Sequence, residues 1–271
     1  MQSTQTLINA SDGPALQTIN ADGTSNIMLV CEHASNRIPS ALDTLGLSED
    51  ALQSHAAWDP GAEAIALLLS KSLDAVLVTA GFSRLVYDLN RPPEHPDAMR
   101  AVSEVYQIPG NSNLSQQDQQ TRTERLYLPF HDAVDVVLDR YQAEGRMPVL
   151  VTIHTFTPVY LGNQREVELG ILHGSDARLA DELLRVAPRI TKFTTLRNAP
   201  YGPEDGVAHS LEIHALPRGI LNVMLEIRND LVATAEQQIE VAQIIETLLL
   251  SALSELSHPS IQHPVSAGAQ A

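Results

Sequence analysis

Short apolar runs alternate with helical patterns along most of this chain. Five runs are rich in β-branched and aliphatic residues, and we predict a strand in each: Ile27–Cys31, Ala75–Thr79, Val149–Ile153, Glu168–Leu172 and Asn222–Ile227. Several of them are apolar on both faces, as strands of a parallel sheet are when helices cover both sides. The pattern predicts an α/β fold of three layers, with a mixed, mostly parallel sheet between helices.

Three helices are predicted from periodicity and from their start signals, over residues 62–73, 176–187 and 238–253. Asp59 precedes the first as an N-cap candidate, with Pro60 at the first helical position. Ser175 precedes the second. Thr234 and Gln237 have the spacing of a capping box before the third.

The two ends of the chain differ in character from its middle. Residues 1–24 are small and polar with two turn signals, and residues 258–271 have no hydrophobic period. No change of composition and no internal repeat interrupts residues 25–257. We therefore predict a single domain over residues 25–257, preceded by a peripheral N-terminal segment and followed by a flexible C-terminal tail.

The charge balance limits the partners of the protein. Its 271 residues include 33 acidic and 17 basic side chains, a formal net charge of −16, and only Lys71 and Lys192 are lysines. Proteins that bind nucleic acid or anionic membranes depend on clustered cationic side chains. The charge predicts a protein that binds neither nucleic acid nor membrane.

Sequence signals for export and for disulfides are missing. No run approaches about 18 apolar residues, and the polar N-terminus lacks the layout of a signal peptide. Cys31 is the single cysteine, which excludes an intrachain disulfide and a multi-cysteine metal cage. We predict a soluble cytoplasmic protein; its oligomeric state is left open.

Polar side chains occupy unusual places at the ends of three predicted strands. Glu32 and His33 follow the first strand, His154 follows the third, and Glu226 interrupts the apolar run of the fifth. Ligands of open α/β sheets bind outside the carboxyl ends of strands, so we predict one shared site there. A structural role for the histidines, and an ion pair between Glu226 and Arg228 on the same strand face, remain as alternatives.

Two further segments carry side chains suited to a binding site. Residues 83–93 place Arg84, Asn90 and Arg91 around a predicted short strand, and an Asn-Arg pair can clamp a carboxylate. The alternative is an arginine that anchors the loop through carbonyl groups. In residues 55–61, Asp59 can cap its helix, ligate a metal or orient a ligating histidine.

Five ordered motifs resemble the N-formylglutamate amidohydrolase family over about residues 25–235. They are Cys-Glu-His-Ala-Ser-Asn-Arg-Ile-Pro (31–39), His-x-x-Trp-Asp-x-Gly-Ala (55–62), Ser-Arg-Leu-Val-x-Asp-x-Asn-Arg (83–91), His-x-Phe-Thr-Pro (154–158) and Leu-Glu-Ile-Arg-Asn-Asp-Leu (225–231). The resemblance implies a fold similar to that of the zinc carboxypeptidases, with an eight-stranded type of mixed sheet. It also implies a zinc-dependent hydrolase of the formyl amide of an N-formylated acidic amino acid, most simply N-formyl-L-glutamate.

The resemblance also implies a set of metal ligands. His33 and His154 match the two ligating histidines of zinc carboxypeptidase-like enzymes. Their third ligand, a glutamate three residues after the first histidine, is Asn36 here. We take Glu32 as the substitute ligand and Asp59 as the second choice.

Further roles follow from the same resemblance. Glu226 matches the general base, and Asn90 with Arg91 matches the pair that holds a substrate carboxylate. Supporting, substrate-side roles are expected for Arg84, Arg228 and Asp59, and a supporting role for His214, which lies near the motifs. A carboxylate-binding or regulatory protein on the same scaffold, and a hydrolase of other N-acyl amino acids or peptides, are the alternative functions.

The resemblance changes what the net charge means for substrates. Salt screens the field of surface charges over about 8 Å, so a small acidic substrate responds mainly to charges nearby. Arg37, Arg84, Arg91 and Arg228 all lie inside the motifs. We therefore expect a positive pocket within an acidic shell.

Overall fold

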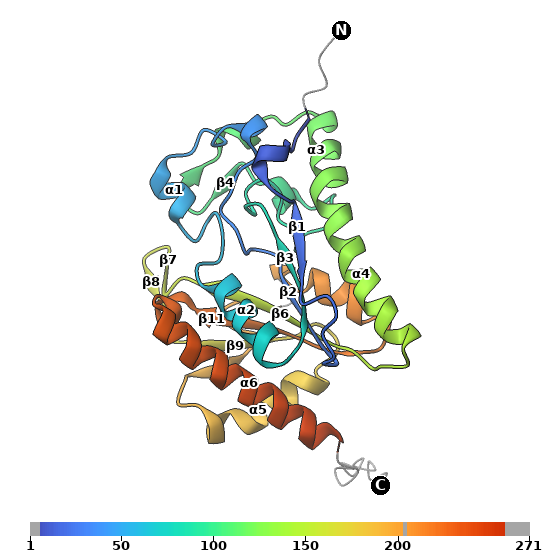
Figure 1. Cartoon of the computed structure of the whole chain (residues 1–271). Helices are drawn as coiled ribbons and strands as arrows, with labels where there is room; N and C mark the ends of the chain where they lie inside the picture. The colour runs from blue at the N-terminus through green and yellow to red at the C-terminus, as the bar shows by residue number, and fades with distance from the viewer. Residues whose placement is uncertain (1–5, 203–204, 258–271) are drawn as a thin grey trace, which may run out of the picture.

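A seven-stranded sheet forms the centre of the computed structural model, which describes residues 6–202 and 205–257 (Figure 1). The strand order is β1-β3-β2-β6-β11-β9-β10. The strands are β1 Leu16–Ile19, β2 Ile27–Cys31, β3 Val76–Ala80, β6 Val149–Phe156, β9 Leu169–Leu172, β10 Thr195–Arg197 and β11 Leu221–Arg228. Two hairpins stand apart from this sheet, β4 Val102–Ser103 with β5 Tyr106–Gln107, and β7 Val159–Tyr160 with β8 Asn163–Gln164.

The sheet is mixed, as predicted. Strands β3, β2, β6 and β11 are parallel neighbours. Strand β1 runs antiparallel to β3, β9 runs antiparallel to β11, and β10 is parallel to β9. Among the described residues this sheet has seven strands rather than the eight that the resemblance implied, and β1 brings part of the segment predicted as peripheral into the sheet edge.

Helices cover both faces of the sheet and complete the three layers. They are α1 Glu49–Gln53, α2 Ala62–Ser72, α3 Gln116–Arg122, α4 Leu128–Ala143, α5 Arg178–Ile190 and α6 Ala235–Ser257. Helices α2, α5 and α6 bury Ile65, Leu183 and Ile245 in one apolar cluster with sheet residues such as Leu225. Helix α4 packs in a second cluster that contains Met224. Because Met224 and Leu225 are neighbours on one strand, the two clusters lie on opposite faces.

The predicted strands are confirmed, while some local predictions were wrong. Helix α2 starts at Ala62 with Gly61 as its N-cap, at φ 87°, so Asp59 does not cap it. The capping box before α6 is confirmed, because Thr234 and Gln237 exchange side-chain and backbone hydrogen bonds. Residues 83–93 form turns rather than a short strand.

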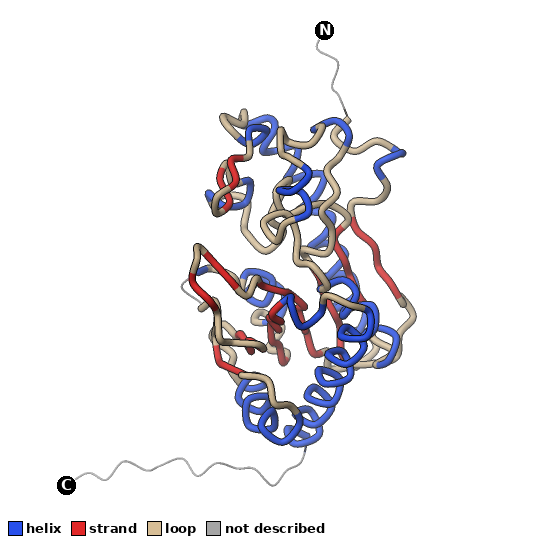
Figure 2. The backbone as a smooth tube through the Cα atoms, turned by 90° about the vertical axis from the view of Figure 1, so that its left-hand side faces the viewer, coloured by secondary structure: helices blue, strands red, loops and turns tan. Residues whose placement is uncertain are grey.

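Loops and short helices make up the upper part of the molecule (Figure 2). Residues 81–127, between β3 and α4, contribute much of this part together with α1, and we call these residues the loop layer. A buried pair fixes it from inside. Asn111 donates to the carbonyls of Leu85 and Arg100, each at 2.8 Å, and accepts from Arg122 at 2.7 Å. Arg122 also donates to the Val86 carbonyl at 3.1 Å. Two separate turns of this layer are thus held to one framework.

None of the helices in the described ranges is long and apolar enough to span a membrane.

The central strands place the polar strand-end residues side by side. In the register of β11, Glu226 lies opposite His154 of β6 and opposite Gly170 of β9. A Cβ atom on Gly170 would approach the Ala199 carbonyl oxygen to 2.0 Å and the Glu226 Cβ to 3.1 Å. Glycine at this position therefore lets β9 pack directly against Glu226.

Replacing Gly170 with alanine should destabilise the fold by about 1–3 kcal/mol or more, because backbone atoms have to move. Urea unfolding of Gly170→Ala measures this change. Gly174→Ala is the matched control, since a Cβ there meets nothing closer than 3.8 Å, and its stability should stay within about 0.5 kcal/mol of the parent. Equal stabilities of the two variants would contradict the packing argument.

Candidate metal centre and active site

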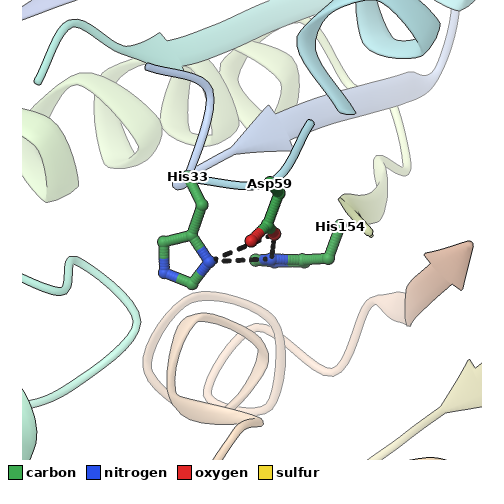
Figure 3. Close-up of side chains that lie close together, drawn as sticks. All are labelled: His33, Asp59 and His154. Atoms are coloured by element: carbon green, nitrogen blue, oxygen red, sulfur yellow. Dashed lines mark hydrogen bonds and ion pairs between the residues drawn. The ribbon is translucent and has the colours of Figure 1, made fainter. Parts of the chain in front are cut away.

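Three buried side chains converge where β2 and β6 end (Figure 3). His33 follows β2, His154 belongs to β6, and Asp59 precedes α2. His33 Nδ1 lies 3.3 Å from Asp59 Oδ2, His154 Nδ1 lies 3.0 Å from the same oxygen, and the two Nδ1 atoms are 3.2 Å apart. These three residues form a group that can hold a metal ion, and no other such group occurs among the described residues.

The outer nitrogen of each imidazole faces a buried carboxylate. His33 Nε2 is 2.7 Å from Asp88 Oδ1. His154 Nε2 is 3.1 Å from Glu32 Oε2, within ion-pair range but without hydrogen-bond geometry. Asp59 faces Nδ1 of both rings, so a proton can occupy the centre of the metal-free cluster. With a metal in that place, the ring proton of each histidine would lie on Nε2, toward Asp88 and Glu32, and Nδ1 would be the ligand atom.

The shape of the cluster fits a tetrahedral metal ion. Zinc binds nitrogen and oxygen ligands at about 2.0–2.2 Å, which places tetrahedral ligand atoms about 3.3–3.6 Å apart, slightly more than in this cluster. The three separations here are 3.0, 3.2 and 3.3 Å. Three lone-pair-bearing atoms this close repel one another unless a cation or a proton lies between them, so the donor set fits a divalent metal.

Charges around the cluster favour the ionised carboxylates. Burial alone would raise the pKa of Glu32, but the adjacent His154 ring lowers it to about 2. Burial alone would lower the pKa of His154, yet the charges of Glu32 and Asp59 raise it well above its usual range. A metal and a proton therefore compete for His154.

Arg84 connects the cluster to the loop layer. Its guanidinium donates to Asp59 Oδ1 at 3.3 Å and to Asp88 Oδ2 at 2.9 Å. Both carboxylates are almost fully buried, and each also contacts His33. Arg84 therefore neutralises and orients the acidic groups around His33. These two hydrogen bonds use both terminal nitrogens of its guanidinium group.

Glu226 stands beside the cluster without an arginine partner. Its Oε2 is buried and makes no hydrogen bond within the described residues. Burial raises the pKa of Glu226 to about 7, the Asp59 charge adds to the rise, and His154 opposes it. A carboxylate with this pKa can exchange a proton near neutral pH.

A cavity of about 260 Å³ opens over these groups, and His33, Asp59, His154 and Glu226 line its floor. Its remaining wall is mostly polar and comes largely from the loop layer and from Tyr201, Asp205 and Val207, with Tyr160 from β7. It includes Arg84, Asp88, Asn90, Arg91, Asp97, Arg100, Ser103, Glu104, His55, Tyr160, Tyr201 and Asp205. The cavity is large enough for a small metabolite.

The predicted Asn90-Arg91 clamp divides into two different roles. The Asn90 amide donates to the Val207 carbonyl and accepts from the backbone N–H of Ser210, so both of its ends are used by the chain. Arg91 donates one hydrogen bond, to the Asp205 carbonyl at 2.6 Å. Arg91 thus keeps donors that the chain does not use and lines the cavity, while Asn90 mainly fixes the chain at Val207 and Ser210.

Two arginines expected near the pocket lie elsewhere. Arg228 pairs with Asp230 at 2.8 Å and Glu168 at 3.5 Å, and it neither lines the cavity nor pairs with Glu226. Arg37 donates to the carbonyls of Gly81, Asp12 and Pro14. The positive pocket is therefore not built as expected: its cationic side chains are Arg84, Arg91 and Arg100, and they face several carboxylates.

The structure also shows site residues that the sequence analysis missed. Asp88 had a visible signal, since it lies inside the Ser83–Arg91 motif, four residues after Arg84. Arg100 lies outside every motif. His55 and Glu104 both line the cavity and are hydrogen-bonded to each other, and only His55 belongs to a motif. Asn36, where a glutamate ligand was missing, hydrogen-bonds to the Leu52 carbonyl instead.

Comparisons with known proteins give the family. The model of the N-formylglutamate amidohydrolase family matches residues 25–233. The chain belongs to this family. A search of curated proteins found no match. Membership in this amidohydrolase family supports an enzyme that hydrolyses amides.

Two solved structures resemble this member of the family. A gene product of Agrobacterium tumefaciens has 53% sequence identity and a TM-score of 0.91, with 93% of this chain and 100% of that chain covered. An N-formylglutamate amidohydrolase from Ralstonia eutropha has 18% identity and a TM-score of 0.64, over 89% of this chain and 98% of that chain. The second likeness shows a shared fold.

Glu226→Gln should stabilise the metal-free protein at pH 8. The carboxyl has a pKa of about 7 in the folded protein against an ordinary 4.5, so the folded state binds more protons than the unfolded state between these values. Stability from this group falls as pH rises from about 4.5 to 7, and glutamine avoids that loss. Thermal unfolding should show a higher Tm for the variant at pH 8 and no gain at pH 4.5. A gain independent of pH would contradict the assignment.

Proposed function

We propose that this protein is a zinc-dependent amidohydrolase that cleaves the amide of an N-formyl, or another N-acyl, acidic amino acid. N-formyl-L-glutamate, which yields formate and glutamate, is the expected substrate. The family supports the reaction class. The single observation that carries the proposal is the triangle of His33, Asp59 and His154 donor atoms beside Glu226, at the floor of a polar cavity.

In this proposal Asp59 takes the third ligand position that the sequence analysis gave first to Glu32. Asp59 Oδ2 lies within 3.3 Å of both histidine Nδ1 atoms, on the inner side of the cluster. The Glu32 carboxylate lies on the outer side, against His154 Nε2. Glu32 and Asp88 then act as the carboxylates that orient the two ligating histidines.

A bound zinc ion would supply a polarised carbonyl and a water of lowered pKa. Glu226 holds and moves the proton in this scheme. It lies opposite His154 on the neighbouring strand and lines the same cavity. Its carboxylate can accept a proton from the attacking water and return it to the leaving nitrogen, a contribution of about 10²–10⁴-fold to the rate.

Arg91 binds the α-carboxylate of the substrate in this proposal. Its guanidinium lines the cavity, and one hydrogen bond to the Asp205 carbonyl holds it in place. Arginine matches a carboxylate through a planar pair of donors. Holding the carboxylate fixes the scissile amide over the metal site, and this positioning accelerates the reaction. Asn90 contributes by fixing the chain at Val207 and Ser210.

Formate release from N-formyl-L-glutamate tests the function directly. Purified protein should contain a divalent metal, lose activity on chelation and regain it with zinc. Glu226→Gln should keep its metal and lose at least about 100-fold in kcat, because its amide cannot take the proton. Glu182→Gln is the control: Glu182 is another buried glutamate, paired with Arg185 on α5, and kcat should not change.

The proposal fails if metal-loaded protein hydrolyses no N-acyl amino acid, or if hydrolysis persists in protein shown to be free of metal. A Glu226→Gln variant as active as its parent would show that Glu226 does not transfer the proton. That result would not contradict the proposed metal site.

A further inference from the structure

Arg100 is a cavity residue that the scheme above does not use. It follows the 3-10 turn Pro96–Met99, outside the motifs of the family, and its side chain is 23% exposed. Its carbonyl accepts a 2.8 Å hydrogen bond from buried Asn111, which Arg122 holds in turn. The backbone at Arg100 is therefore anchored to the same framework as the turn that carries Arg84.

The donors of Arg100 are not used by the described part of the chain. Its guanidinium lies 3.6 Å from Asp88 and 3.7 Å from Asp97, distances of ion pairs rather than of hydrogen bonds. No hydrogen bond leads from this side chain to a described residue. Arg84, by contrast, donates to two buried carboxylates at 2.9 and 3.3 Å.

Two arginines of the cavity thus retain donors for a ligand. Arg91 uses one nitrogen, on the Asp205 carbonyl, and Arg100 uses none. They are close enough that the charge of Arg100 contributes to the lowered pKa of Arg91, after the larger effect of burial. Asp88 and Asp97 already balance part of this positive charge. The unused hydrogen-bond donors of Arg91 and Arg100 still suit a ligand that carries two carboxylates.

We propose that Arg100 determines the substrate specificity by binding the side-chain carboxylate, so that the enzyme selects dicarboxylic N-acyl amino acids over neutral ones. The proposal rests on the function proposed above, with Arg91 on the α-carboxylate. Charge selection then comes from the loop layer, on which Arg100 lies, while the chemistry comes from the strand ends.

Two neighbouring acids compensate the charge of Arg100 in the absence of a ligand. Asp88 and Asp97 lie 3.6 and 3.7 Å from its Nη2 and offset the cost of partial burial. At 3.6–3.7 Å they leave the donor fork free to form shorter, bidentate bonds to a carboxylate. Asp88 also contacts His33, so a ligand on Arg100 lies near the metal cluster.

Selectivity between two isosteric substrates tests this role. N-formyl-L-glutamate and N-formyl-L-glutamine differ in the charge of the side chain but hardly in size. Arg100→Met should lower kcat/KM for the glutamate substrate by about 10- to 100-fold, the effect expected for a lost charge-assisted hydrogen bond. The value for the glutamine substrate should stay within about threefold, so the preference should nearly vanish.

Two further variants separate specific from general effects. Arg100→Lys keeps the charge but not the fork, and should retain a reduced preference for the glutamate substrate. Arg189→Met removes an exposed arginine of α5, on the other face of the sheet, and should change neither substrate. If Arg100→Met does not fold, the lysine variant still tests the selectivity.

Binding measurements separate this proposal from the proposed reaction. Glutarate, with two carboxylates, should bind to the parent protein more tightly than butyrate by calorimetry, and Arg100→Met should remove that difference. This readout holds even if no amide is hydrolysed. An equal loss of kcat/KM for both substrates, or unchanged selectivity together with unchanged glutarate binding, would overturn the role of Arg100.

Discussion

The candidate site depends on the crowding of three donor atoms that would repel one another in the absence of a cation or a shared proton. Two imidazole nitrogens and one carboxylate oxygen lie 3.0–3.3 Å apart in a buried position. They stay there because each side chain has a charged partner outside the cluster: Asp88 pairs with His33, Glu32 with His154, and Arg84 with Asp59. These surrounding charges fix the rings in one orientation, and such preorganisation is what a metal site needs.

The fold divides the work between two parts of the chain. The sheet brings His154 and Glu226 together through the register of two parallel strands, with His33 at the end of a third. The loops between β3 and β6 add Arg91 and Arg100, whose guanidinium groups line the cavity above them. Chemistry built on rigid strands and recognition built on anchored loops is a common arrangement in α/β proteins.

Much of this could be predicted from the sequence. The buried strands could, because short continuous apolar runs bounded by turns are typical of them, whereas β1 is short and half polar. His33, His154 and Glu226 stood out as polar groups at apolar strand ends. Asp59 could not be ranked above Glu32, since an aspartate before a helix has the same pattern whether it caps or ligates. Arg100 depends on a loop path that no local pattern reveals.

Anomalous diffraction from crystals grown with zinc, measured above and below the zinc absorption edge, tests the central claim most directly. The account predicts one strong peak within about 2.0–2.2 Å of His33 Nδ1, His154 Nδ1 and Asp59 Oδ2, with Glu32 on the far side of the His154 ring. A peak bound by Glu32 and His154 Nε2, or a fully loaded metal site elsewhere in the molecule, would contradict it.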